Sequence, residues 1–264
     1  MIRILTLARV VWLDVLRRKD FYILLILLAI LLVALLSMNV FGLGGVTAYV
    51  ADIGLLLSWI FSWVLAISIG CRLLPQEESR GTIFSLLAKP VRRSELIVGK
   101  WLGAWSVVSV ATAMFYVLVF GVTMLKGWTL PIGVALEAIV LHGMVIAIII
   151  AAALMFSARL NSDAAATLTG ALTATSFLLV PRIPEFVAEA GGVRGGLMLF
   201  LYNLLPHFEI FDLRMRVLHN YGTISLTTFL MITAYGLLVT AIFLALAWVA
   251  YRSKHFARGS LSGY

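Results

Sequence analysis

Long uncharged runs constrain this chain more than any other feature. Residues 21–51 contain no charged side chain, although a helix needs only about 20 apolar residues to cross the hydrocarbon core of a bilayer. Glycines at positions 42, 44 and 45 interrupt the run, so we divide it into two spans. The mean hydropathy is +1.08 and only 12% of the residues are charged. The sequence therefore predicts an all-α polytopic membrane protein.

Six segments have the length and composition of membrane-spanning helices, and one transmembrane domain, residues 1–264, accounts for them all. Asn161, Ser162 and Asp163 are N-cap candidates for the fifth span, and Pro181 and Pro184 are expected to end it. The predicted spans lie near residues 21–41, 50–71, 101–125, 131–158, 164–181 and 225–251.

The basic residues predict the orientation of these spans. If the N-terminus is cytoplasmic, all but five of the 20 Lys and Arg residues fall on the cytoplasmic side, as the positive-inside rule requires. We therefore expect both termini in the cytoplasm. The net charge of +8 does not indicate a nucleic-acid partner, because the charges flank apolar runs and form no separate basic domain. The five exceptions are Lys126, Arg182, Arg194, Arg214 and Arg216.

Residues 1–20 have the pattern of an amphipathic surface helix. Apolar side chains recur along one stripe, and Arg3, Asp14 and Arg17 lie roughly opposite. Such a helix can lie in the inner headgroup layer as an elbow before the first span. A basic flank that only orients the first span is the alternative. The stripe consists of Ile4, Ala8, Val11 and Val15.

The longest polar-rich segment follows the second predicted span and reads QEESRGTIFSLLAKPVRRSELIVGKWLG over residues 76–103. Its charges are costly to bury in lipid, so it lies outside the membrane. Acidic residues at its start favour a helix N-terminus, and Pro90 is expected to end that helix. Ser94 is the predicted N-cap of the next helix, with Glu95 behind it. An apolar face on a cytoplasmic helix can seat in a groove of a soluble partner.

This segment resembles the first cytoplasmic loop of ABC transporter permeases of the type-2 export family, which read roughly E-x-x-x-G-T-x-x-x-L-L-x-x-P-x-x-R-x-x-x-x-x-G-K. The six-span pattern extends the resemblance to the whole chain. The resemblance implies that residues 76–99 are a coupling segment between spans 2 and 3, and that short external helices lie within residues 182–222. The implied ATPase-coupling residues are Glu77, Glu78, Gly81, Thr82, Ile83, Phe84, Leu87, Pro90 and Arg93.

The resemblance also implies the partners. Gly99-Lys100 lacks the upstream glycine of a Walker A motif and is followed by Trp101, so we expect no cofactor in this chain and no enzymatic activity. ATP and Mg²⁺ are expected on a separate ABC ATPase subunit. The other expected partners are a second permease copy or homologue and the lipid bilayer. The implied location is a prokaryotic plasma (inner) membrane, and the implied activity is ATP-driven export.

Two stripes of small residues, spaced four apart, mark helix faces that can approach another helix closely. Either they pack within one subunit, or they meet near the centre of a dimer and line the pathway. The second span carries Gly54, Ser58, Ser62, Ala66 and Gly70, and the fifth carries Ala166, Gly170 and Ala174.

The sequence leaves the role of some polar residues open. Glu137 and His142 fall in the fourth span, where ionisable side chains usually mark a function or a buried pair. Because they are about 140° apart on a helix, they need not face each other. Cys71 is the single cysteine, so no internal disulfide forms, and no metal site is expected. The external polar residues His207, Glu209, Asp212, Met215 and His219 match no metal-ligand motif.

A weaker resemblance concerns residues 202–212, which are similar to a segment in the permease branch that serves nitrous-oxide-reductase maturation. It supports an alternative in which the complex uses ATP to drive a periplasmic maturation or assembly process. A membrane-embedded enzyme is a second alternative, although the sequence has neither an H-E-x-x-H nor a G-x-S-x-G motif.

Overall fold

The structure is a computed structural model that describes residues 2–17, 19–37, 46–79, 92–125 and 127–252. All regular secondary structure in these residues is helical, so the prediction of an all-α chain is confirmed there. Helices suit a membrane because they satisfy every backbone polar group internally.

Five helical stretches of the described residues are long and apolar enough to cross a membrane. A shorter apolar helix, α2 (Asp20–Ser37), precedes them and ends at the edge of the described residues. The first predicted span, 21–41, therefore lies partly outside the described residues. The five stretches are Ala48–Glu78, Arg93–Met124, Ile132–Ser157, Ser162–Val187 and Leu226–Arg252.

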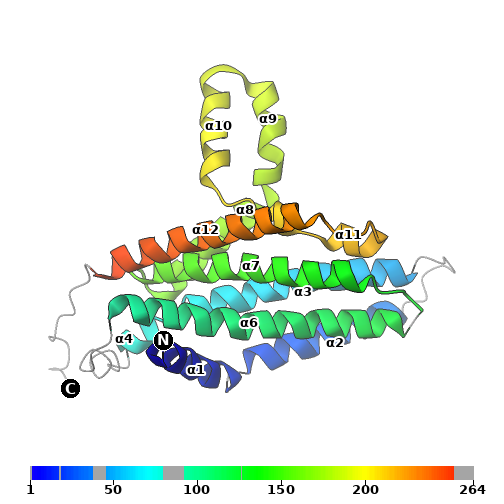
Figure 1. The fold of residues 1–264 in the computed structure, drawn as a ribbon, viewed down its shortest axis with the longest axis horizontal. Coiled ribbons are helices and arrows are strands. Elements are labelled where there is room, and N and C mark those ends of the chain that lie inside the picture. The colour runs from blue at the N-terminus through cyan, green and yellow to red at the C-terminus, as the bar shows by residue number, and fades with distance from the viewer. Residues whose placement is uncertain (1, 18, 38–45, 80–91, 126, 253–264) are drawn as a thin grey trace.

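These helices form an elongated bundle in which α7 (Ile132–Ser157) is central. α7 packs against α3 (Val46–Gly70), α6 (Arg93–Met124) and α12 (Leu226–Arg252). Apart from Glu137, His142 and Ser157, its sequence is apolar on all sides, as expected of a helix that is surrounded by others. Figure 1 shows α4 (Pro75–Ser79) and the end of α12 at one end of the bundle and α11 (Arg214–His219) at the other.

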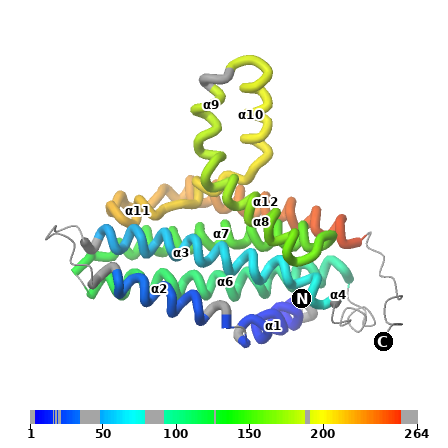
Figure 2. The backbone as a smooth tube through the Cα atoms, turned by 180° about the vertical axis from the view of Figure 1, so that it is seen from behind, coloured from blue at the N-terminus to red at the C-terminus, as the bar shows by residue number. Residues whose placement is uncertain are grey.

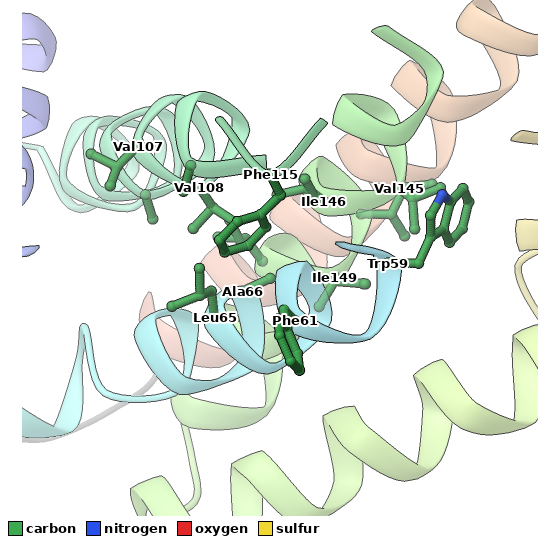
Figure 3. Close-up of a cluster of buried hydrophobic side chains, with 14 of the residues drawn as sticks. Trp59, Phe61, Leu65, Ala66, Val107, Val108, Phe115, Val145, Ile146 and Ile149 are labelled. Carbon is green, nitrogen blue, oxygen red and sulfur yellow. The ribbon is translucent and has the colours of Figure 1, made fainter. Parts of the chain in front are cut away.

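The core lies where α3, α6 and α7 meet. Figure 3 shows side chains from the three helices converging there, among them Leu65, Val108 and Ile146. Ala66 and the alanines of α7 are fully buried, and small side chains of this kind let helices approach closely in a membrane. The bundle is thus held by tight packing along α7.

The N-terminal helix α1 (Ile2–Leu16) packs lengthwise against the first half of α6. Two glycines of α6 make this approach possible. A Cβ atom on Gly103 would lie 2.8 Å from the Cα atom of Ala8, and one on Gly99 would lie 2.8 Å from the Cβ atom of Leu7. The predicted apolar stripe of α1 faces this contact, since Ala8, Val11 and Val15 are buried.

A helical hairpin projects away from the bundle, as Figures 1 and 2 both show. It follows α8 (Ser162–Leu178), whose predicted N-cap Asn161 accepts the Ala164 N–H at 2.9 Å. The predicted prolines coincide with a break in the helical run, but a 3-10 turn carries the chain straight into another helix. The hairpin consists of α9 (Ile183–Ala190) and α10 (Gly192–Leu204), which pack against each other.

The chain then returns to the bundle. The short 3-10 helix η2 (Phe208–Phe211) buries Phe208 and Phe211, and α11 packs on α3 and α7. Asn220 ends α11 in a left-handed conformation with φ of 51°, which asparagine tolerates better than most residues. Ser225 then accepts the Thr228 N–H at 3.2 Å at the start of α12.

Candidate functional site

The polar segment after α3 is attached to the bundle by a buried ion pair. The Nζ atom of Lys100 in α6 lies 2.6 Å from Oε1 of Glu77 in α4. The same Nζ donates to the carbonyl oxygen of Leu73 at 2.8 Å, and Lys100 is only 3% exposed. A buried charge is tolerated when it is both paired and hydrogen-bonded. The pair therefore fixes α4 against the beginning of α6.

A second attachment joins the start of α6 to the end of α12. The Nη1 atom of Arg93 donates to the carbonyl oxygens of Tyr251, at 3.2 Å, and of Arg252. The last carbonyls of a helix have no partner within the helix and carry partial negative charge. The Arg93 guanidinium thus caps α12, and α6 and α12 are joined at the same end of the bundle as α4.

The prediction that Ser94 caps α6 is wrong. α6 begins at Arg93, and its N-cap is Arg92, whose backbone N–H donates to Oε2 of Glu95 at 2.9 Å. A glutamate at the third helical position reaches back in this way in a capping box. Ser94 lies inside the first turn, where its preference for the cap position has no effect.

The predicted coupling residues are divided by the limits of the described residues. Glu77 and Glu78 lie in α4, and Arg93 is the first residue of α6. The predicted helix between them remains a prediction. The predicted coupling residues outside the described residues are Gly81, Thr82, Ile83, Phe84, Leu87 and Pro90.

The small-residue stripe of α3 faces the inside of this chain. A Cβ atom on Gly54 would lie 2.9 Å from Cγ1 of Val119 in α6, and one on Gly70 would lie 2.7 Å from Cβ of Ala153 in α7. Ser58 donates to the carbonyl oxygen of Gly54 at 2.8 Å. All members of the stripe, Gly54, Ser58, Ser62, Ala66 and Gly70, are buried in the single chain.

The small-residue stripe of α8 is less buried than that of α3. Ala166 and Gly170 are only partly buried, and Ala174 is exposed. No atom outside the helix's own backbone lies within 4 Å of the position where a Cβ atom would stand on Gly170. This face of α8 is therefore uncovered by the described residues of the chain.

His142 lies in a closed circuit of hydrogen bonds between α3, α6 and α7. Its Nε2 atom lies 2.7 Å from Ser62 Oγ, and its Nδ1 atom lies 3.2 Å from Tyr116 Oη. Trp59 Nε1 donates to Tyr116 Oη at 3.1 Å, and Ser62 Oγ donates to the carbonyl oxygen of Trp59 at 2.8 Å. With the proton of a neutral imidazole on Nε2, each donor in the circuit has one acceptor. We define this set, Trp59, Ser62, Tyr116 and His142, as the histidine circuit.

The segment between α8 and α12 is joined to the histidine circuit by Arg214 of α11. Its guanidinium carbon lies 5.5 Å from the ring centroid of Trp59 and 5.6 Å from that of Phe177 in α8. Asp212 holds the same guanidinium, with Nε–Oδ1 and Nη2–Oδ2 distances of 3.0 and 2.7 Å. A cation over aromatic rings is stabilising, more so where water is excluded. Arg214 therefore links α11 to α3 and α8.

Glu137 and His142 have different partners. The Oε2 atom of Glu137 accepts the N–H of Ile224 at 3.1 Å, just before α12 begins. Glu137 thus joins the first part of α7 to the residues just before α12. His142 makes its contacts within the histidine circuit, deeper in the bundle.

The polar residues that were predicted to be external are dispersed. His207 contacts Tyr235 Oη through its backbone N–H at 3.1 Å, Asp212 binds Arg214, and the His219 ring stacks on Tyr221. Among the described residues, no group of three or more His, Cys, Asp or Glu side chains is arranged to hold a metal ion.

Sequence reasoning missed several of these contacts. The sequence predicts none of the contacts that Lys100, Trp59, Tyr116 and Arg214 make. A lysine next to the start of a predicted span, in the same polar segment as two glutamates, is a signal for the ion pair with Glu77. The Gly99-x-x-x-Gly103 spacing is a signal for the close approach of α1.

Comparison with known proteins agrees with a bundle of apolar helices. A protein-family model described as "ABC-2 family transporter protein" matches residues 5–256. The match includes most of α1 and all helices from α2 to α12. A comparison with curated proteins found no match.

Proposed function

Since the chain belongs to the ABC-2 family of transporter proteins, we propose that it is the permease subunit of an ATP-driven exporter. It works with a separate ABC ATPase subunit, which binds ATP and Mg²⁺, and it forms the translocation pathway together with a second permease copy or homologue. It spans a prokaryotic plasma membrane six times, with α2 as the first span, and both termini are cytoplasmic.

The attachment of the coupling segment at both ends carries this proposal. Glu77 holds α4 to α6 through Lys100, and Arg93 holds α6 to the last turn of α12. A partner that displaces residues 76–99 therefore displaces α6 and α12 together. This supports a mechanism in which closure of the ATPase pair moves spans and so alternates access to the pathway.

The open face of α8 supports association with a second permease. Its uncovered side presents small residues, including Gly170 and Ala174. Small side chains allow another helix to approach closely in lipid, where van der Waals packing drives association. The stripe of α3 contributes to packing inside each subunit.

Assembly with an ATPase tests the proposal directly. The chain is co-expressed with candidate ABC ATPases from the same genome, and each complex is isolated through a tag on the permease. Glu78→Lys and Phe84→Glu are expected to abolish co-purification, whereas Glu185→Lys, a charge reversal in the exposed hairpin helix α9, leaves it intact. If no ATPase co-purifies with the unaltered chain, or if the loop variants bind as well as Glu185→Lys, the proposal is wrong.

A second candidate is an ABC permease that drives a periplasmic maturation or assembly process without bulk transport. Residues 202–212 favour this second candidate. Phe208 and Phe211 are buried and anchor the segment to the bundle, so a movement of the spans would also move the segment. Genomic neighbours that encode metal-enzyme maturation, together with ATPase activity that responds to a periplasmic partner protein, distinguish it from export.

A further inference from the structure

An apolar groove opens at the corner between α1 and α2. Trp12 and Val15 line it from α1 and Tyr22 from α2, while α3 and α6 contribute Leu65, Val107 and Met114. Its volume is about 260 Å³. Roughly 150 Å³ of apolar cavity is enough for a benzene ring, so the groove has room for a segment of a hydrocarbon chain.

The groove exists because of how α1 is held. Gly99 and Gly103 bring α1 against α6, and the chain then turns into α2, which packs on α3 and α6. Trp12 donates from Nε1 to Ser106 Oγ at 2.8 Å, so the polar edge of its indole ring is satisfied without an occupant. The groove is thus apolar, and its exposed edge includes Tyr22 and Met114.

Exposed basic residues lie beside this corner in the sequence. Residues 1–20 carry five basic side chains and two acidic ones, Asp14 and Asp20, a net charge of +3. Arg17 and Lys19 are exposed and lie in the sequence between two groove residues, Val15 and Tyr22. A cationic corner directly beside an apolar groove matches a molecule with an anionic head and a hydrocarbon tail.

We propose that the groove holds one acyl chain of an anionic phospholipid, whose phosphate is bound by Arg17 and Lys19. The lipid fills the wedge between the α1–α2 corner and the helices α3 and α6. It therefore stabilises the position of α1 on α6. The proposal depends on the chain being embedded in a membrane, and it is independent of any ATPase partner.

Photo-crosslinking tests the acyl-chain position. The purified full chain in mild detergent is incubated with phosphatidylglycerol that carries a diazirine on one acyl chain, and the cross-linked peptides are mapped. Cross-links are expected on α1 and α6 around the groove. Ala111→Phe, or Val110→Trp if the first variant does not fold, fills the groove and should remove them, whereas Leu237→Phe on the exposed face of α12 should not. Unchanged cross-links in a folded groove variant overturn the proposal.

Native mass spectrometry tests the headgroup. Phosphatidylglycerol and phosphatidylcholine with identical acyl chains compete for the same protein sample. Wild-type protein should retain phosphatidylglycerol roughly tenfold or more in preference, because each basic side chain near the anionic group contributes about 1 kcal/mol. Arg17→Gln/Lys19→Gln should lose the preference, and the external double variant Arg182→Gln/Arg194→Gln should keep it. Equal retention of the two lipids by wild type, or an unchanged preference in Arg17→Gln/Lys19→Gln, overturns the proposal.

Discussion

Glu77 and Lys100 form a 2.6 Å ion pair that connects α4 to α6. The two side chains are unequally buried, since that of Lys100 is 4% exposed and that of Glu77 is 23% exposed. The pair lies where the proposed coupling segment meets the spans. The pair therefore holds α4 directly against α6.

The unequal burial predicts which partner matters more. Glu77→Gln leaves a buried lysine charge without its counter-ion, whereas Lys100→Met leaves a glutamate whose side chain is partly exposed. We expect Glu77→Gln to destabilise the protein by about 3–5 kcal/mol, as measured for buried pairs that lose one partner, and Lys100→Met to cost clearly less. Thermal unfolding in detergent, followed by tryptophan fluorescence, checks the order. An equal or reversed order contradicts the description of the pair as buried on the lysine side.

The contact of α1 on α6 predicts the effect of a single methyl group. Gly103→Ala places a Cβ atom 2.8 Å from the backbone of Ala8, so α1 must move. A Val11→Cys reporter, buried in wild type, should react faster with a maleimide in the Gly103→Ala background. Gly121→Ala, in the same helix, is the matched control because its Cβ atom meets no neighbour among the described residues. Equal labelling rates in the two backgrounds would show that α1 is not held by this glycine.

The histidine circuit predicts that substitutions within it have non-additive effects on the free energy of unfolding. Tyr116→Phe removes both the acceptor for Trp59 Nε1 and the donor to His142 Nδ1, and each unsatisfied buried group costs about 1–3 kcal/mol. His142→Phe disrupts the same circuit, so the double variant should lose less stability than the sum of the single ones. A double-mutant cycle of unfolding free energies measures this, with an expected coupling of about 0.5–3 kcal/mol. Additive losses would mean that the two side chains act independently.

Arg93 is predicted to affect coupling more than stability. Its hydrogen bonds to the end of α12 are partly exposed, so Arg93→Gln should cost about 1 kcal/mol or less. ATP turnover of the assembled complex should nevertheless fall, because the Arg93 side chain no longer holds the end of α12 to α6. Arg92→Gln is the control, since Arg92 caps α6 through its backbone N–H. If complexes with the two permease variants hydrolyse ATP at equal rates, the Arg93 link does not transmit motion.

The spans could be predicted where local signals agree. The apolar run near 131–158 and the cap residue Asn161 correspond to α7 (Ile132–Ser157) and to the start of α8, because hydropathy and capping depend on neighbouring residues alone. The start of α6 was predicted wrongly for a related reason. N-cap preference favours Ser94, but the reach of Glu95 to the Arg92 backbone decides the helix start.

The contacts that build the candidate site could not be predicted, because they join residues far apart in the sequence. In the sequence, Ser62 belongs to a stripe of small residues and His142 is an ionisable residue within a span. Only the packing of α3 on α7 brings the two together. The same holds for Glu77. Its place in a polar segment predicts a contact at the surface, whereas the fold brings it beside Lys100. Periodicity identifies the buried face of a helix but not the helix that covers it.

Site-specific cross-linking tests the central claim most directly. A photoreactive amino acid replaces Phe84 in the proposed coupling segment or, as the control, Phe200, which is exposed in α10, and cells that co-express the ATPase are irradiated. We expect a permease–ATPase cross-link from position 84 and none from position 200. A cross-link from position 200, or none from position 84 in cells that contain the assembled complex, would contradict the assignment of residues 76–99 as the ATPase-coupling segment.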